Sequence, residues 1–126
     1  MATTVRTVLT VQAFQSTLNF GPWSFDNFNS YPEFFGADLV IGATARAQII
    51  GGTAPVVSYI TTVQSLLLWT PTTDVRVGLH GVDSQTAGFT LTAGEVICMG
   101  EVSMNALNLY NPDSAACSVL VAVGGT

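Results

Sequence analysis

Hydrophobic and polar residues alternate along the second half of this chain. Every second residue of Val75–Leu79 is apolar, and Gly88–Thr92 and Ala116–Val123 repeat the pattern. Segments rich in turn-forming residues, such as Asn111–Ser114, separate these runs. A period of two, interrupted by turn signals roughly every 8–12 residues, is typical of the strands of an antiparallel sandwich or barrel.

The first half of the chain contains weaker strand candidates and no segment with the period of an amphipathic helix. The candidates are Thr3–Val11, Phe14–Phe20, Ala37–Ile50 (one long strand, or two short ones around Gly42) and Val56–Thr62. Eight or nine strands in total predict an all-β protein, an antiparallel β-sandwich of jelly-roll type that forms a single domain over residues 1–126. The predicted core consists of Val75, Val77, Leu79, Phe89, Leu91, Leu107, Leu109, Val119 and Val121.

The segment between residues 20 and 35 follows neither period. It holds seven of the twelve aromatic residues, set among Gly21, Pro22 and several asparagines, and this composition predicts a long aromatic loop. Aromatic side chains in a loop either plug the open end of a sandwich or anchor an interface, and both interpretations stay open. The candidate interface residues are Phe20, Trp23, Phe25, Phe28, Tyr31, Phe34 and Phe35.

Charged residues are scarce, at 9% of the chain against about 25% in an ordinary soluble domain. There is no lysine, and 48% of the residues are hydrophobic. The surface is therefore either mildly polar or covered by other subunits, and its strand edges lack lysine gatekeepers. We expect a homo-oligomer. Arg46 and Arg76, in strand-like segments, should pair with carboxylates, whereas Arg6 should be solvated.

The charge balance also excludes some partners. A net charge of -5 with only three arginines cannot neutralise a phosphate backbone, so no nucleic-acid partner is expected. No run approaches about 18 uninterrupted apolar residues, so no membrane partner is expected either. The first residues lack the basic start and apolar block of a signal peptide, which predicts synthesis and assembly in the cytoplasm.

The inventory of reactive residues is too small for most enzymes. His80 is the single histidine, so a multi-histidine metal centre is impossible, and no Gly-x-Ser-x-Gly motif is present. Glu95 and Glu101 are expected to be surface charges, and Cys98 and Cys117 to be buried free thiols within apolar strands. We predict that the chain is not an enzyme and uses no catalytic residue, metal or cofactor.

Several motifs resemble those of a known family. Gly88–Glu95 reads Gly-Phe-Thr-Leu-Thr-Ala-Gly-Glu, and an aliphatic strand, the Ala106–Asn111 strand and a Val-rich final strand follow it. This order, over about 50 of the 126 residues, resembles small jelly-roll virion proteins of tailed bacteriophages. The resemblance implies a capsid decoration (cement) protein or another small head, neck or tail component. It also implies a location in the virion, a trimeric state, and the major capsid protein or other virion proteins as partners.

The alternative is a binding module, a lectin-like or receptor-binding jelly roll that recognises glycans. Tryptophan side chains could then stack on sugar rings. Trp69 ends an apolar strand and is expected in the core, which leaves Trp23 as the better candidate.

Overall fold

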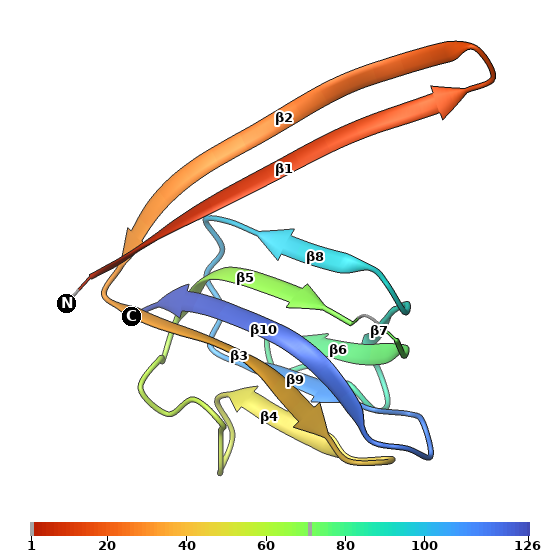
Figure 1. The fold of residues 1–126 in the computed structure, drawn as a ribbon. Coiled ribbons are helices and arrows are strands. Elements are labelled where there is room, and N and C mark those ends of the chain that lie inside the picture. Colours follow the sequence, from red (N-terminus) through yellow and green to blue (C-terminus); the bar gives the residue numbers. More distant parts are fainter. Residues whose placement is uncertain (1, 71) are drawn as a thin grey trace.

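The computed structural model describes residues 2–70 and 72–126, in which it contains ten strands and no helix (Figure 1). Within these ranges, the side chains of Thr7, Gln15, Phe20, Trp23, Phe25, Asn27 and Phe28 are not described. The strands are β1 (Thr3–Gln15), β2 (Leu18–Tyr31), β3 (Glu33–Ile41), β4 (Arg46–Ile50), β5 (Val63–Trp69), β6 (Val75–Leu79), β7 (Phe89–Leu91), β8 (Val96–Met99), β9 (Leu107–Tyr110) and β10 (Cys117–Gly125).

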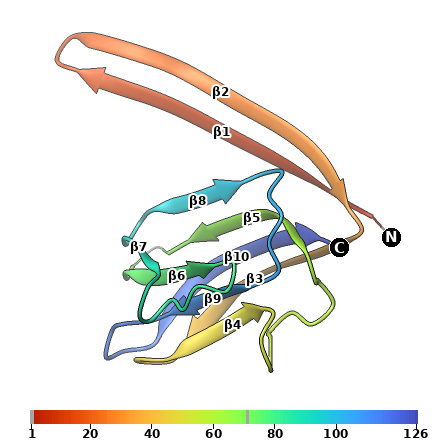
Figure 2. The same ribbon diagram turned by 180° about the vertical axis from the view of Figure 1, so that it is seen from behind.

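Eight of these strands form an antiparallel β-sandwich. One sheet has the order β3-β10-β5-β8 and the other the order β4-β9-β6-β7. The chain changes sheet at every connection between β3 and β10 except β6–β7, which wraps the two sheets around each other as in a jelly roll (Figures 1 and 2). The predicted fold class is therefore confirmed. We call the two sheets the arm-side sheet and the loop-side sheet, in that order.

The core lies between the two sheets, and most of the predicted core residues are in it. Val75, Val77, Leu91, Leu107, Leu109, Val119 and Val121 are buried, and Leu79 is partly buried. Phe89 is 44% exposed, contrary to the prediction, because β7 is a three-residue strand at the edge of its sheet. Its ring therefore lies at the rim of the core.

The segment Val56–Thr62 is not a strand, although it was predicted as one. Gly51 and Gly52, both with positive φ, reverse the chain after β4. Two backbone hydrogen bonds then tie Val56 and Val57 to Gln48 and Ile49. The segment leaves the sheet after this contact, yet it still places Val57 and Ile60 in the core. Ala37–Ile50 divides into β3 and β4, as the two-strand alternative predicted.

The first two strands form a long hairpin outside the sandwich, which we call the arm (β1 and β2). They pair from Thr3↔Tyr31 to Gln15↔Leu18, with the two-residue turn at Ser16 and Thr17. The predicted loop at 20–35 is therefore wrong, as is a strand at Phe14–Phe20, which would span this turn. The glycine and proline that indicated a loop instead form a bulge, because two residues of β2 lie opposite the single residue Gln12 of β1.

The arm lies on the outer side of the arm-side sheet, away from the loop-side sheet, in both ribbon views (Figures 1 and 2). Its base is close to the end of β10, so the two chain termini lie near one another. With 13 residues in β1, the arm is about 43 Å long at roughly 3.3 Å per residue.

Candidate functional site

The outer face of the arm-side sheet is unusually apolar. Strand register places two rows of residues across β10, β5 and β8: Leu120, Trp69 and Val96 in the first, and Ala122, Leu67 and Cys98 in the second. We call these six residues the apolar face. β3 contributes Asp38 to the first row and Gly36 to the second. Among the described residues of these two rows, Asp38 is the one charged side chain.

Trp69 and Cys98 belong to this face, although both were predicted to be buried. In β5, Leu66 and Leu68 point into the core, so Trp69 points outward and is 42% exposed. In β8, Ile97 and Met99 pack against the core, which leaves Cys98 exposed. Cys117 is buried, as predicted. Successive residues of a strand alternate between its two faces, so a continuous apolar run does not reveal which residues are inward.

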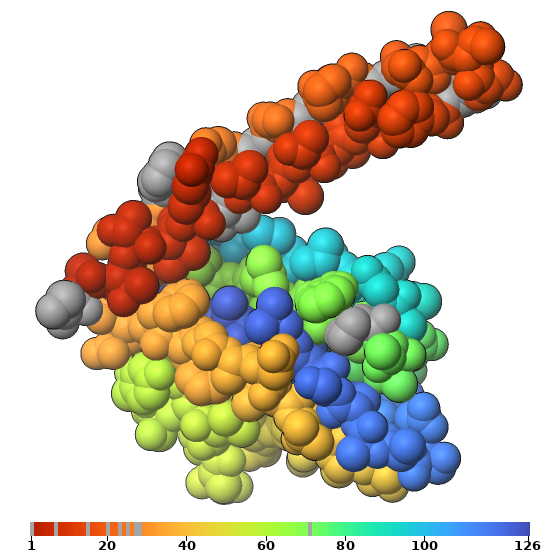
Figure 3. Space-filling view, in the orientation of Figure 1, coloured from red at the N-terminus to blue at the C-terminus, as the bar shows by residue number. Residues whose placement is uncertain are grey.

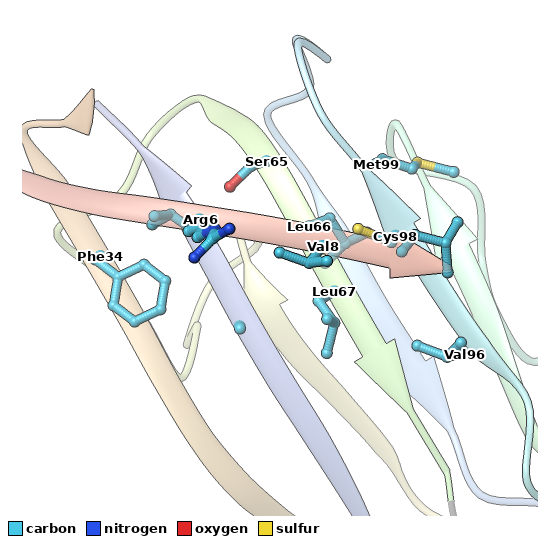
Figure 4. A pocket seen from close by; sticks show the side chains of 12 residues that line it. Arg6, Val8, Phe34, Ser65, Leu66, Leu67, Val96, Cys98 and Met99 are labelled. Carbon is cyan, nitrogen blue, oxygen red and sulfur yellow. The ribbon is translucent and has the colours of Figure 1, made fainter. Parts of the chain in front are cut away.

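The arm crosses the apolar face without closing onto it. A cavity of about 410 Å³ lies between them. Val8 of β1 lines one side, and Leu67, Val96 and Cys98 line the other (Figure 4). Leu9 of β1 also lines the cavity. Two well-packed apolar layers normally interdigitate and leave few voids larger than a water molecule. The space is therefore an unfilled apolar gap, which we call the gap.

Polar bonds inside the arm join its two strands. The Arg6 guanidinium donates to both carboxylate oxygens of Asp26, at 3.0 and 2.7 Å, and the hydroxyls of Thr10 and Ser24 lie 3.3 Å apart. The hydrogen bond to Asp26 raises the pKa of Arg6 above its usual value. The prediction that Arg6 is only solvated is therefore wrong. These bonds stabilise the hairpin, which as an isolated two-stranded unit would be marginal in water.

The distal arm, residues 11–19, exposes large apolar side chains. Phe14 is 69% exposed, and Val11 and Leu18 are also exposed. Figure 3 shows this part of the arm standing clear of the sandwich.

The loop-side sheet has the opposite character, because its outer face is polar and covered by residues 80–88. Arg76 donates to the carbonyl oxygens of Ser84 (2.9 Å) and Gly88 (2.6 Å). The buried Asn108 amide accepts from the Ser84 N–H at 2.9 Å and donates to the Val82 carbonyl at 2.8 Å. Arg76 is thus held by carbonyl groups and not by the predicted carboxylate.

Arg46 forms the predicted ion pair, with Asp83 of the covering loop at 3.2 Å. The pKa of Asp83 is lowered, first by the hydrogen bond from the Gln85 N–H and then by Arg46. The loop-side face is therefore closed by the chain's own polar groups, whereas the arm-side face is left apolar.

The seven predicted interface residues are divided among four locations. Phe20, Trp23, Phe25 and Phe28 lie along β2, in the arm, and their side chains are outside the described part of the structure. Tyr31 is buried at the arm's base against Gly124, where an added Cβ would collide with its ring. Phe34 lines the gap, and Phe35 packs against the core. Leu67, Trp69, Val96 and Cys98 were missed by the sequence-based prediction.

The reactive residues do not converge. His80 is exposed at the end of β6, and Glu95 accepts a hydrogen bond from the Thr92 N–H in its own turn. Among the described residues, no three His, Cys, Asp or Glu side chains are grouped to hold a metal ion. In the same residues, no helix is long and apolar enough to cross a membrane.

Comparison of the chain with models of protein families, with curated proteins and with solved structures gave no match. The arm, the gap and the apolar face are therefore the features from which a function can be inferred.

Proposed function

We propose that this protein is a non-enzymatic structural subunit of a bacteriophage particle, a decoration (cement) protein that stabilises the capsid as a homo-oligomer. The observation that carries the proposal is a projecting arm with exposed apolar side chains beside an equally apolar sheet face. Exposed surfaces of this kind mark protein–protein contacts. The virion and the trimeric state come from the sequence resemblance.

Burial of the arm contributes favourable free energy to assembly. Five of its side chains, Val8, Leu9, Val11, Phe14 and Leu18, are between 42% and 69% exposed. Full burial of an apolar side chain contributes about 1.5–3 kcal/mol, so covering the exposed half of five gives about 4–8 kcal/mol per arm. A closed ring repeats the contact at every subunit, and the high local concentration in a particle adds mass action.

The charge also fits this role. The chain has no lysine and a net charge of -5. Such a protein would be repelled by a packaged nucleic acid, so it suits the outer surface of a shell.

The test is assembly followed by shell binding. Light scattering of the purified full chain should give three times 13.2 kDa. Particles assembled from the major capsid protein of the same genome should then bind the chain at a saturating ratio. Failure to bind such particles, whatever the oligomeric state, would reject the decoration role.

A glycan-binding module is the second candidate, because Trp69 is 42% exposed on the outer face of the arm-side sheet. Sugar sites combine a stacking surface with a few convergent polar groups. The cross-strand neighbours of Trp69 are Leu120 and Val96, which offer none. A glycan array probed with the native chain and with Trp69→Ala decides this question, because only binding that the substitution removes would support a sugar site.

A further inference from the structure

We infer that the distal arm of one copy docks on the apolar face of a second copy and fills the gap there. The inference rests on the homo-oligomer of the proposed function and names the contact that forms it. It requires no shell, so it can be tested separately from the decoration role.

The arm is too long for its own sheet to cover. At about 43 Å it exceeds the longest sandwich strands, which have nine residues and span about 30 Å at roughly 3.3 Å per residue. It also exceeds the width of four strands spaced about 4.8 Å apart. Residues 11–19 therefore project beyond the sheet, as Figure 3 shows. Phe14 and Leu18 need a surface that this subunit cannot supply.

The gap is the complementary feature. Its volume of about 410 Å³ corresponds to about fourteen water molecules at roughly 30 Å³ each. A buried water needs two to four polar partners, but apart from Arg6 and Ser65 the side chains that line the gap are apolar or sulfur-containing. Arg6 already bonds Asp26. Apolar side chains suit this space better than water.

A second copy is the occupant because the same chain supplies both unmatched surfaces. The rows of the face carry one charge, Asp38, and the exposed apolar side chains of the distal arm carry none, so neither surface selects a charged partner. An arm-to-face contact joins two different patches, so it can be made reciprocally in a two-fold pair or close as a three-membered ring, and without closure it would continue as a filament. In the two closed forms every arm and every apolar face is used.

The available area is of the right order. An aromatic side chain offers roughly 150–250 Å², so the exposed fractions of Phe14 and Trp69 alone provide about 160–280 Å² per copy. Val96 and Leu120 extend the face, whereas Val11 and Leu18 lie on the other side of the two-stranded arm from Phe14, because Leu18 pairs with Gln15. A standard interface buries about 800 Å² per partner, and each copy here contributes both an arm and a face.

A cysteine on the arm tests the contact directly, because Cys98 is exposed on the face and Cys117 is buried. Under mild oxidation, Phe14→Cys should form disulfides between chains, giving covalent dimers for a two-fold pair and covalent trimers for a three-membered ring on a non-reducing gel. The double variant with Cys98→Ser should lose it. Val82→Cys, an exposed position on the opposite side of the sandwich, should not cross-link. A disulfide within one chain, or a cross-link that survives Cys98→Ser, would overturn the inference.

Charge substitutions provide the second measurement. Phe14→Asp on the arm and Val96→Asp on the face should each weaken self-association at least tenfold by sedimentation, with an unchanged far-UV spectrum. Val82→Asp is the matched control. If both variants assemble like the native chain, or if the native chain is monomeric, the inferred docking of the distal arm on a second copy's apolar face is wrong. Shell binding by such proteins would leave the decoration role standing, so the two failures are distinguishable.

Discussion

At the scale of single residues, the clearest expectation concerns the core. Leu109 of β9 is fully buried between the sheets. Leu109→Ala should lower the free energy of unfolding by about 2–5 kcal/mol, because it removes apolar contacts and leaves a cavity. Phe89→Ala, in the same sheet but at the exposed rim, should cost less despite the larger side chain removed. Urea unfolding of both variants measures which substitution lowers the free energy of unfolding more. A larger decrease for Phe89→Ala would show that Phe89 does not lie at the rim of the core.

Asp83 should give the covering loop a dependence on pH. Its pKa is lowered in the folded protein by the Gln85 N–H and by Arg46. The stabilisation it provides is therefore complete above the unfolded value of 3.8 and is lost as the pH falls through the folded pKa. The Gln85 amide signal in an NMR titration should move with a midpoint below 3.8. Asp83→Asn should abolish this titration, and a midpoint at or above 3.8 would contradict the bonding described.

Residue patterns predicted which segments are strands better than which way their side chains point. Strict alternation in β6 and β10 gave the correct inward residues. In β5 the run Leu66–Trp69 is apolar at every position because both faces of the arm-side sheet are apolar. The local sequence then contains no signal for which side chains of β5 point into the core, and only the pairing of β5 with β10 determines this. This is why Trp69 and Cys98, the central residues of the candidate site, were misplaced.

At the scale of elements, the covering loop presses directly on β6. Gly78 points outward from this strand, and an added Cβ would collide with the Val82 carbonyl and approach the Ser84 nitrogen to 2.9 Å. Gly78→Ala should therefore displace residues 82–84 and lower stability by about 1–3 kcal/mol, as overpacking does. Faster hydrogen exchange at Ser84 is the local readout. Gly42→Ala, whose new Cβ would meet only Ala45 at 3.7 Å, is the control and should change neither quantity.

The arm has structural features that cannot be predicted from short windows of the sequence. Gly21 and Pro22 are normally turn residues, and here they form a bulge within a long strand. A two-stranded hairpin has two free edges, so a proline without an N–H is tolerated there. The register from Thr3 to Tyr31 joins residues 28 positions apart, and no short sequence window contains both. Aromatic residues favour strands, and that propensity was the one available signal.

At the scale of the whole molecule, folding and assembly are located in different parts of the chain. All members of the hydrophobic core cluster come from residues 41–123, and none comes from the arm. The arm is joined to the sandwich at Tyr31, which packs against Gly124. The sandwich should therefore fold without the arm, provided that Tyr31 is kept.

A truncated chain of residues 30–126 tests this separation. It should keep an all-β far-UV spectrum and a cooperative unfolding transition, because every strand of both sheets and the whole core cluster remain. It should lose self-association, because the apolar side chains of β1 are gone. It should also bind a hydrophobic dye more strongly than the native chain, because the apolar face would then be covered neither by its own arm nor by the arm of a neighbouring copy.

The matched control is the full chain with Val82→Asp, which should behave as the native protein. A truncated chain that is unfolded would show that the arm completes the fold, and one that assembles normally would place the contact between copies on the sandwich itself.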